Sequence, residues 1–372
     1  MIAEHVWIST LTDRFGEPSE GVRVGIGDDA AVLEPSNRPS VWTVDAAVEG
    51  VHFTFAIADA YTVGFRSMMA ALSDLAAMGA APRGVLSALT LPAGFEETEL
   101  NELARGQREA AALVGTSVIG GNVSRGPCVS VTTTALGECR RPLLRSGATV
   151  GEIVWVCGAL GMAAAGLKVL LESERLDERA RACVRDELEL CMTAWRRPHA
   201  RISEALSVSD LATSGIDVSD GLAQDLGHVA LASSVDIELD ADALLQREPS
   251  LVKVCEVFGW DPLALILSGG EDYAVVVTTR ASDDLTALGF ARIGRVVASS
   301  ASHVERDELH ERSAVKVIRG GELITAPAGF DHGRLQELQR HASGTGTSRN
   351  IERMLAKAAS RCPGTVTFFN IP

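Results

Sequence analysis

The sequence predicts a mixed α/β protein built from two units. Apolar segments of strand length alternate with longer segments of helical periodicity across residues 22–318, and this alternation is typical of α/β architecture. The chain has 372 residues, which is enough for two domains. The segment RRPLLRSGATVGE combines Pro, Gly and charged residues, so it predicts a linker with a domain boundary near residue 147.

Strands in the first half are indicated by apolar, β-branched segments, and helices by apolar residues three or four positions apart. The expected strands are 22–26, 41–44, 85–91, 116–119 and 128–138, and the expected helices are 60–78 and 96–114. The last two strands are expected to flank a turn at GGN, residues 120–122, because Gly and Asn favour turns.

The second half continues the alternation. The expected strands are 153–157, 235–239, 274–278, 290–297 and 314–318. The expected helices are 162–172 and 176–194, and a third is expected to begin at residues 217–220 and to end near 232. Beyond residue 330, HASGTGTSRN is typical of a flexible linker. We therefore expect an N-terminal domain at 1–147, a C-terminal α/β domain at 148–331 and an extra tail at 332–372.

The composition argues against several classes of protein. The chain has 34 Lys and Arg residues against 49 Asp and Glu residues, a net charge of -15, which argues against a nucleic-acid or membrane surface. The N-terminal segment lacks the apolar core of a signal peptide. Seven cysteines without a CxxC pair argue against disulfides and structural zinc. We expect a cytoplasmic protein with neither a nucleic-acid nor a membrane partner.

Short acidic segments beside Gly or small residues point to a function. They are GIGDDAAVL, TVDAAVEGVHF, LSDLAAMG, GIDVSDGLAQDLGH and SGGEDY. Carboxylates in apolar surroundings are costly unless they are paired or coordinated, and no matching set of Lys and Arg lies beside these. Mg²⁺ with a phosphorylated ligand would satisfy them. The alternative is that Asp28, Asp45 and Asp220 are turn and helix-cap residues.

These motifs, together with LSDLAAMGAAPRG, LLRSG and RRPHAR, resemble the thiamine-monophosphate kinase family over roughly residues 20–332. That family belongs to the aminoimidazole-ribonucleotide-synthetase-like superfamily. The resemblance implies a two-domain fold, with an N-terminal sheet domain that forms a homodimer and a C-terminal α/β domain. It also implies an ATP- and Mg²⁺-dependent kinase that transfers the γ-phosphoryl group of ATP directly onto thiamine monophosphate, giving thiamine diphosphate.

The resemblance also implies roles for individual residues. The metal ligands would be Asp28, Asp29, Thr43, Asp45, Asp74, Asn122, Asp217 and Asp220. The ATP contacts would be Gly121, Asn122, Arg145 and Ser219, with Asp220 and Arg145 acting in catalysis, and the acceptor substrate would meet His52, Glu271 and Phe330. Some of these have plain structural alternatives: a strand end for His52, a solvated linker charge for Arg145, a turn for Gly121 and a packed aromatic for Phe330.

Three positions depart from the family pattern. Asn122 stands where the family usually has Asp, Val44 where it usually has Thr, and Met162 where it usually has Asp. An amide oxygen can still bind Mg²⁺, but it adds no negative charge. Three functions stay open: an active thiamine-monophosphate kinase, a paralogue that uses ATP to phosphorylate or activate another small molecule, and a nucleotide-binding protein without turnover.

Overall fold

The computed structural model describes residues 4–172, 177–299 and 314–324, and these form two compact units. Unit 1 contains 4–75 and 82–138, and unit 2 contains 76–81, 139–172, 177–299 and 314–324. Each unit has its own sheet with helices packed on it, which confirms the mixed α/β class. Phe330 and the predicted tail at 332–372 lie outside the described residues.

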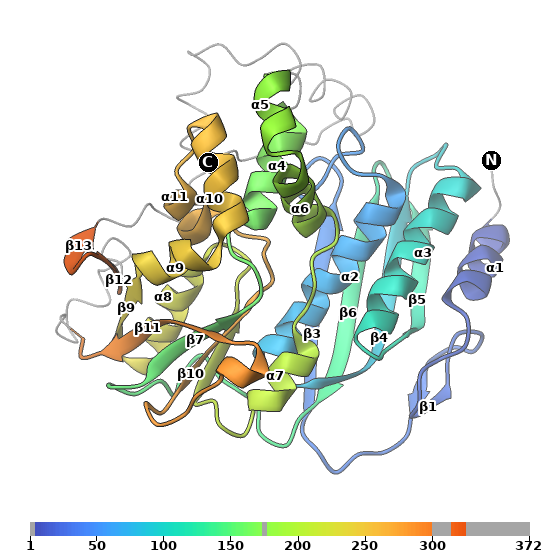
Figure 1. The fold of residues 1–372 in the computed structure, drawn as a ribbon. Coiled ribbons are helices and arrows are strands. Elements are labelled where there is room, and N and C mark those ends of the chain that lie inside the picture. Colours follow the sequence, from blue (N-terminus) through green and yellow to red (C-terminus); the bar gives the residue numbers. More distant parts are fainter. Residues whose placement is uncertain (1–3, 173–176, 300–313, 325–372) are drawn as a thin grey trace. The chain divides into compact units, whose positions relative to one another are not determined.

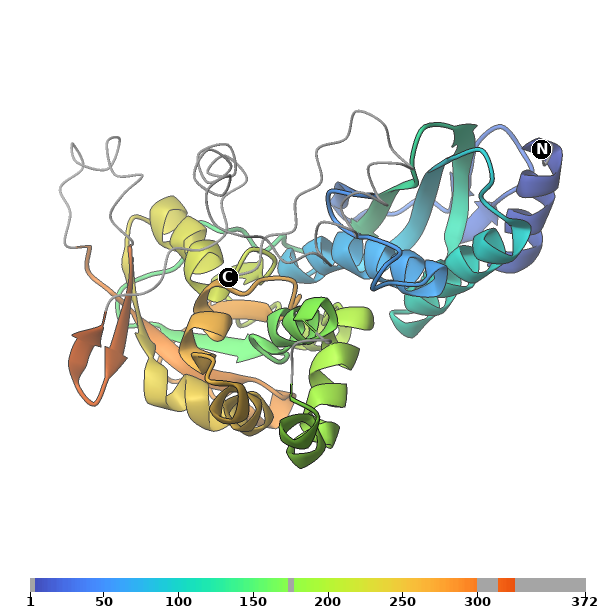
Figure 2. The ribbon, with the colours of Figure 1, turned by 90° about the horizontal axis from the view of Figure 1, so that it is seen from above.

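Unit 1 is a four-stranded sheet with helices α2 (Ala60–Ala77) and α3 (Glu97–Leu113) on one face (Figures 1 and 2). Its strands, in the order β3-β6-β4-β5, are β3 (Ser40–Val48), β6 (Ser130–Glu138), β4 (Ala81–Leu91) and β5 (Val118–Arg125). Strand β3 runs antiparallel to β6, and β4 runs parallel to β5. Helix α1 (Glu4–Phe15) packs on α3 and β5, and β1 (Val22–Val24) pairs with β2 (Val32–Leu33).

Helices α2 and α3 approach each other backbone to backbone because each has a glycine at the contact. A Cβ atom at Gly64 would lie 2.0 Å from the carbonyl oxygen of Leu103, and one at Gly106 would lie 2.2 Å from that of Tyr61. Both distances are far below van der Waals contact, so no larger residue fits at either position. These contacts fix the layer of helices that covers the sheet.

The predicted turn at GGN is wrong. Strand β5 runs straight through residues 120–122, and Asn122 is paired with Ala88 of β4. Gly121 is needed there because a Cβ atom would lie 1.9 Å from the carbonyl oxygen of Ser87. Glycine in a strand often marks such a close approach of two backbones. The chain reverses only between Arg125 and Ser130, where β6 begins.

Unit 2 is a seven-stranded sheet with the order β13-β12-β9-β11-β7-β10-β8. Neighbouring strands are antiparallel except for the parallel pair β9 and β12. The strands are β7 (Ile153–Cys157), β8 (Ser214–Asp217), β9 (Asp236–Asp240), β10 (Val275–Thr279), β11 (Ala291–Val297), β12 (Val315–Arg319) and β13 (Glu322–Ile324). Every residue of β7 and β10 is buried, so both faces of the sheet are covered at its centre.

The helices of unit 2 fall between these strands. They are α4 (Met162–Glu172), α5 (Glu178–Cys183), α6 (Arg185–Arg196), α7 (Ile202–Val208), α8 (Leu222–Ser233), α9 (Ala241–Arg247), α10 (Pro249–Phe258), α11 (Pro262–Ser268) and a 3₁₀ turn at Thr286–Leu288. Helices α8 and α9 pack on the sheet, and α6 packs on α4 and α10. In the described parts of the chain, no helix is both long and apolar enough to span a bilayer.

Two helix predictions in unit 2 need correction. The helix predicted at 176–194 is interrupted at Val184, which has a non-helical backbone (φ -131°, ψ 31°), so that α5 ends before it and α6 begins after it. Helix α8 begins at Leu222, not at 217–220. Asp217 is the last residue of strand β8, and Asp220 lies in the loop that follows it.

Candidate active site

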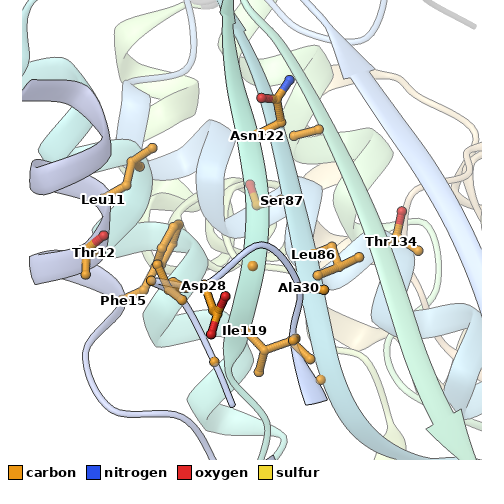
Figure 3. Close-up of a pocket in the computed structure, with 18 of the residues that line it drawn as sticks. Leu11, Thr12, Phe15, Asp28, Ala30, Leu86, Ser87, Ile119, Asn122 and Thr134 are labelled. Atoms are coloured by element: carbon orange, nitrogen blue, oxygen red, sulfur yellow. The ribbon is translucent and has the colours of Figure 1, made fainter. Parts of the chain in front are cut away.

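A pocket of about 890 Å³ lies in unit 1. Helix α1, the segment 25–33 and the strands β3 to β6 line it. Its polar lining includes Asp28, Asp29, Asn122 and Thr134, and its apolar lining includes Trp42. In the view of Figure 3, Asp28 and Asn122 are drawn toward opposite ends of the pocket. Asp28, Asp29 and Asn122 therefore line the same pocket, but Asn122 does not lie beside Asp28.

The acidic loop between β1 and β2 carries Asp28 and Asp29, which are both exposed. The Asp29 backbone N–H donates to Oδ1 of Asp28 at 2.8 Å. Just before them, Gly27 has φ +120°, and open space surrounds the position of its missing Cβ. The loop thus presents two carboxylates at an unobstructed surface, where they can reach a cation.

A second polar group in unit 1 joins strand β3 to helix α2. The hydroxyl of Thr43 donates to Oδ2 of Asp74. Asp45 lies two residues beyond Thr43 on the strand, so the two side chains point to the same face. Neither Thr43 nor Asp74 lines the pocket that contains Asn122.

In unit 2, Asp225 organises the loop between β8 and α8. Its Oδ2 accepts the backbone N–H groups of Ser219, Asp220 and Gly221 at 2.9, 3.1 and 3.2 Å. Burial, and after it the carboxylates of Asp217 and Asp220, raise the pKa of Asp225 to about 8, although the backbone donors oppose the shift. Three carboxylates therefore act on one another in a small volume.

The oxygen donors of each unit, taken separately, fit a divalent cation in their chemistry. In unit 1 they are the carboxylates of Asp28, Asp29, Asp45 and Asp74 and the hydroxyl of Thr43, which are hard ligands of the kind that Mg²⁺ prefers. In unit 2 they are carboxylates, and a cation would relieve the repulsion among Asp217, Asp220 and Asp225. Within 4–172, 177–299 and 314–324, however, no three His, Cys, Asp or Glu side chains form a metal-binding group.

Arg145 and Asp220 act on the same imidazole. Burial lowers the pKa of His228, the Arg145 guanidinium lowers it further, and Asp220 opposes them. Ser233 holds the backbone near Arg145, because its Oγ donates to the Arg145 carbonyl oxygen at 3.0 Å and accepts the N–H of Gly147 at 3.1 Å. The side chain of Arg145 is exposed.

The segment 268–274 is joined to the loop after β8 by three backbone hydrogen bonds. Glu271 N–H donates to the Ser219 carbonyl at 2.8 Å, and two further bonds of 2.8 Å join Val218 to Tyr273 and Ala274. Gly270 is required here, since its φ is +67° and a Cβ atom would lie 2.6 Å from the Ser219 carbonyl oxygen. The predicted ATP contact and the predicted substrate contact of unit 2 are therefore neighbours.

The remaining predicted positions have clear local roles. His52 is exposed, and its Nδ1 accepts the Val48 N–H at 3.1 Å, which fixes the turn after β3. Met162 is buried with its sulfur 3.7 Å from Sγ of Cys191, so this departure from the family pattern is a core residue. Val44 is exposed on β3.

Two contributors to these sites, helix α1 and Trp195, and the role of a third, Asp225, were not predicted from the sequence. Helix α1 lines the pocket with Leu11 and Phe15, and their spacing of four residues was a helical signal. Asp225 belongs to the acidic motif GIDVSDGLAQDLGH, but its hydrogen bonds depend on a folded loop. Trp195 donates its indole N–H to Oε2 of Glu271 at 3.0 Å. The two residues are 76 positions apart in the chain, so no local sequence pattern indicates their contact.

Comparison with known proteins identifies the family. The family model "AIR synthase related protein, N-terminal domain" matches residues 27–139. Thiamine-monophosphate kinase of Aquifex aeolicus (strain VF5) is 34% identical over 274 residues, which cover 73% of this chain and 86% of that protein. The Escherichia coli (strain K12) enzyme is 33% identical over 338 residues, 87% of this chain and 96% of that protein. This chain belongs to the thiamine-monophosphate kinase family.

Solved structures agree with this thiamine-monophosphate kinase assignment. AaThiL complexed with AMPPCP and TMP has a TM-score of 0.69 at 30% identity and covers 82% of this chain and 91% of its own. Thiamine-monophosphate kinase from Stenotrophomonas maltophilia K279a has a TM-score of 0.70 at 30% identity, covering 87% and 98%. The hydrogenase maturation protein HypE in complex with ATP shares the fold alone, at 20% identity and a TM-score of 0.64.

Proposed function

We propose that this protein is an ATP-dependent kinase that converts thiamine monophosphate to thiamine diphosphate by direct, in-line phosphoryl transfer. The observation that carries the proposal is its similarity, over 91% of the neighbour's length, to a structure that holds AMPPCP and TMP. The carboxylate-rich loops of both units support it, because phosphoryl transfer depends on positioning and on charge stabilisation.

The chemistry requires no general base. The acceptor phosphate has a second pKa near 6, so it is largely ionised at neutral pH. The barrier is the repulsion between two polyanions, which Arg145 can reduce by holding phosphate oxygens with its guanidinium. Mg²⁺, when bound, would neutralise phosphate charge and align the transferred group.

We assign the residues of each unit separately. In unit 1, the proposed metal ligands are Asp28, Asp29, Thr43, Asp45, Asp74 and Asn122, with Gly121 and Asn122 at the nucleotide and His52 at the acceptor. In unit 2, Asp217 and Asp220 are proposed to bind metal, and Ser219 and Arg145 are proposed to contact ATP. Asp220 and Arg145 are also proposed to act in catalysis, and Glu271 is proposed to contact the acceptor. Phe330 is proposed for the acceptor as well.

We also propose that the protein is a homodimer. Strand β3 lies at the edge of the unit 1 sheet, and the side chains of Trp42 and Val44 on it are each 64% exposed. Adjacent large apolar side chains on an edge strand are typical of a surface that another chain covers. Because the reaction uses ATP, we propose a cytoplasmic location. We also propose that the N-terminal domain ends at residue 147 and the C-terminal domain at residue 331.

Asn122 supports a second candidate, a paralogue with another acceptor, because the amide lacks the charge of the usual Asp. The test is ADP release by the purified protein with Mg²⁺ and ATP, with thiamine monophosphate, with thiamine and with no acceptor, together with detection of thiamine diphosphate. We expect ADP release only with thiamine monophosphate and none in excess EDTA. Binding of ATP without turnover on thiamine monophosphate would contradict the proposed kinase, and would fit either a paralogue with another acceptor or a nucleotide-binding protein without turnover.

A further inference from the structure

Glu271, which the proposed function assigns to the acceptor, has a backbone conformation that non-glycine residues rarely adopt. Its φ is +58°, and that of Tyr273 two residues later is +49°. Only Ser234 shares this property among the other non-glycine residues of the described chain. Such conformations persist only where surrounding contacts impose them, and they are frequent at functional sites.

The side chain of Glu271 is held from helix α6. Indole Nε1 of Trp195 donates to its Oε2 at 3.0 Å. Trp195 lies in the last turn of α6 and is 1% exposed, and it continues the buried face formed by Leu188 and Cys191. A buried, packed indole has little freedom to rotate, so this donor fixes the direction of the carboxylate.

The next residue ties the same segment to helix α4. The two carboxylate oxygens of Asp272 accept the N–H groups of Gly161 at 2.6 Å and Ala163 at 3.1 Å, at the start of α4. Helix α4 in turn fits closely against α6, because a Cβ atom at Gly166 would lie 2.1 Å from the Cys191 carbonyl oxygen. Glu271 and Asp272 are therefore attached to two helices that are fixed to each other.

We propose that Trp195 is a positioning residue that orients the Glu271 carboxylate toward the acceptor substrate. This role rests on the proposed function. It means that a buried residue of helix α6, Trp195, contributes to specificity for the acceptor. The strained backbone presents Glu271, and the indole selects one orientation of its carboxylate. Loss of the indole N–H should weaken recognition of the acceptor and leave ATP binding unchanged.

The test compares Trp195→Phe with Trp155→Phe. Trp155 is a matched control, since it is also buried in unit 2 and donates its indole N–H at 3.1 Å, but to Oγ1 of Thr279. We expect Trp195→Phe to raise KM for thiamine monophosphate about tenfold or more, as for loss of a hydrogen bond to a charged group. The KM for ATP should stay within about twofold in both variants.

The outcomes separate this inference from the proposed function. A wild-type protein that does not phosphorylate thiamine monophosphate overturns the proposed function and the role of Trp195 with it. An active wild type with an unchanged KM for thiamine monophosphate in folded Trp195→Phe overturns the role of Trp195 alone. Equal increases for both substrates, or equal effects of the two variants, would show a structural role only.

A second measurement does not require Trp195→Phe to fold. The chain has five tryptophans, so single Phe variants of the other four assign the ¹⁵N indole resonance of Trp195 by elimination. Thiamine monophosphate added without ATP should shift this resonance in the wild type, and the shift should be lost in Glu271→Gln. An unmoved resonance at saturating thiamine monophosphate would contradict the inference.

Discussion

At the scale of single residues, the carboxylate of Asp225 combines two opposing effects. It accepts three backbone N–H groups, which stabilises the loop, and it lies near Asp217 and Asp220, which repel it. All three donors reach the same oxygen, Oδ2. An asparagine can present its amide oxygen at that position, so Asp225→Asn removes the charge and keeps an acceptor.

We expect Asp225→Asn to stabilise the protein in EDTA, and more at pH 8 than at pH 5. Because the folded pKa is raised to about 8 from about 3.9 in the unfolded chain, the folded state binds this proton more tightly. Ionisation between those values therefore costs stability as pH rises. The difference of about 4 pKa units corresponds to roughly 5 kcal/mol at pH 8 and roughly 1–2 kcal/mol at pH 5, so the gain should be about 3–4 kcal/mol larger at pH 8.

Urea unfolding of wild type and variant in EDTA at both pH values measures this difference. Asp210→Asn is the control, because Asp210 forms an exposed ion pair with Arg140 and such pairs contribute little. A gain of equal size at pH 5 and pH 8 would mean that Asp225 is not the titrating group.

At the scale of elements, glycines decide how closely the helices pack. We expect Gly166→Ala in α4 to destabilise the protein by about 2–4 kcal/mol or prevent folding, because its Cβ would overlap the Cys191 carbonyl. Gly227→Ala in α8 is the matched variant, since nothing lies within 4 Å of its Cβ position. It should stabilise by roughly 0.5–1 kcal/mol through helix propensity.

Thermal unfolding of the two variants provides the comparison. A Gly166→Ala variant with the Tm of the wild type, or with the same shift as Gly227→Ala, would contradict the close contact between α4 and α6 that also supports Glu271.

Elements with a clear period could be predicted from the sequence, whereas those set by tertiary contacts could not. Strand β7 and helix α4 have the predicted bounds, because an unbroken apolar segment and a run of small and apolar residues specify them locally. GGN was predicted as a turn because its strand role depends on the Ser87 backbone, which is 34 residues away. The same limit applies to the site: motif residues such as Asp220 could be named, but Trp195 could not.

At the scale of the whole molecule, the exposed apolar side chains of β3 predict the oligomeric state. Trp42→Asp should convert a dimer to a monomer at micromolar concentration, because it places a charge on the proposed interface. Leu113→Asp is the control, since Leu113 is 60% exposed on α3 of the same unit. Sedimentation velocity measures the mass, and a monomeric wild type or a dimeric Trp42→Asp would contradict the proposed dimer.

For the nucleotide contact that we propose in unit 2, the three N–H groups that Asp225 accepts also determine which form of the nucleotide can bind. In many phosphate-binding loops, such N–H groups point at the ligand and hold bare phosphate directly. Here an internal carboxylate occupies them, so the loop offers mainly negative charge to an approaching polyphosphate. A phosphate mimic that carries no cation would therefore compete poorly, and inhibitors of this enzyme should be designed around groups that bring a metal with them.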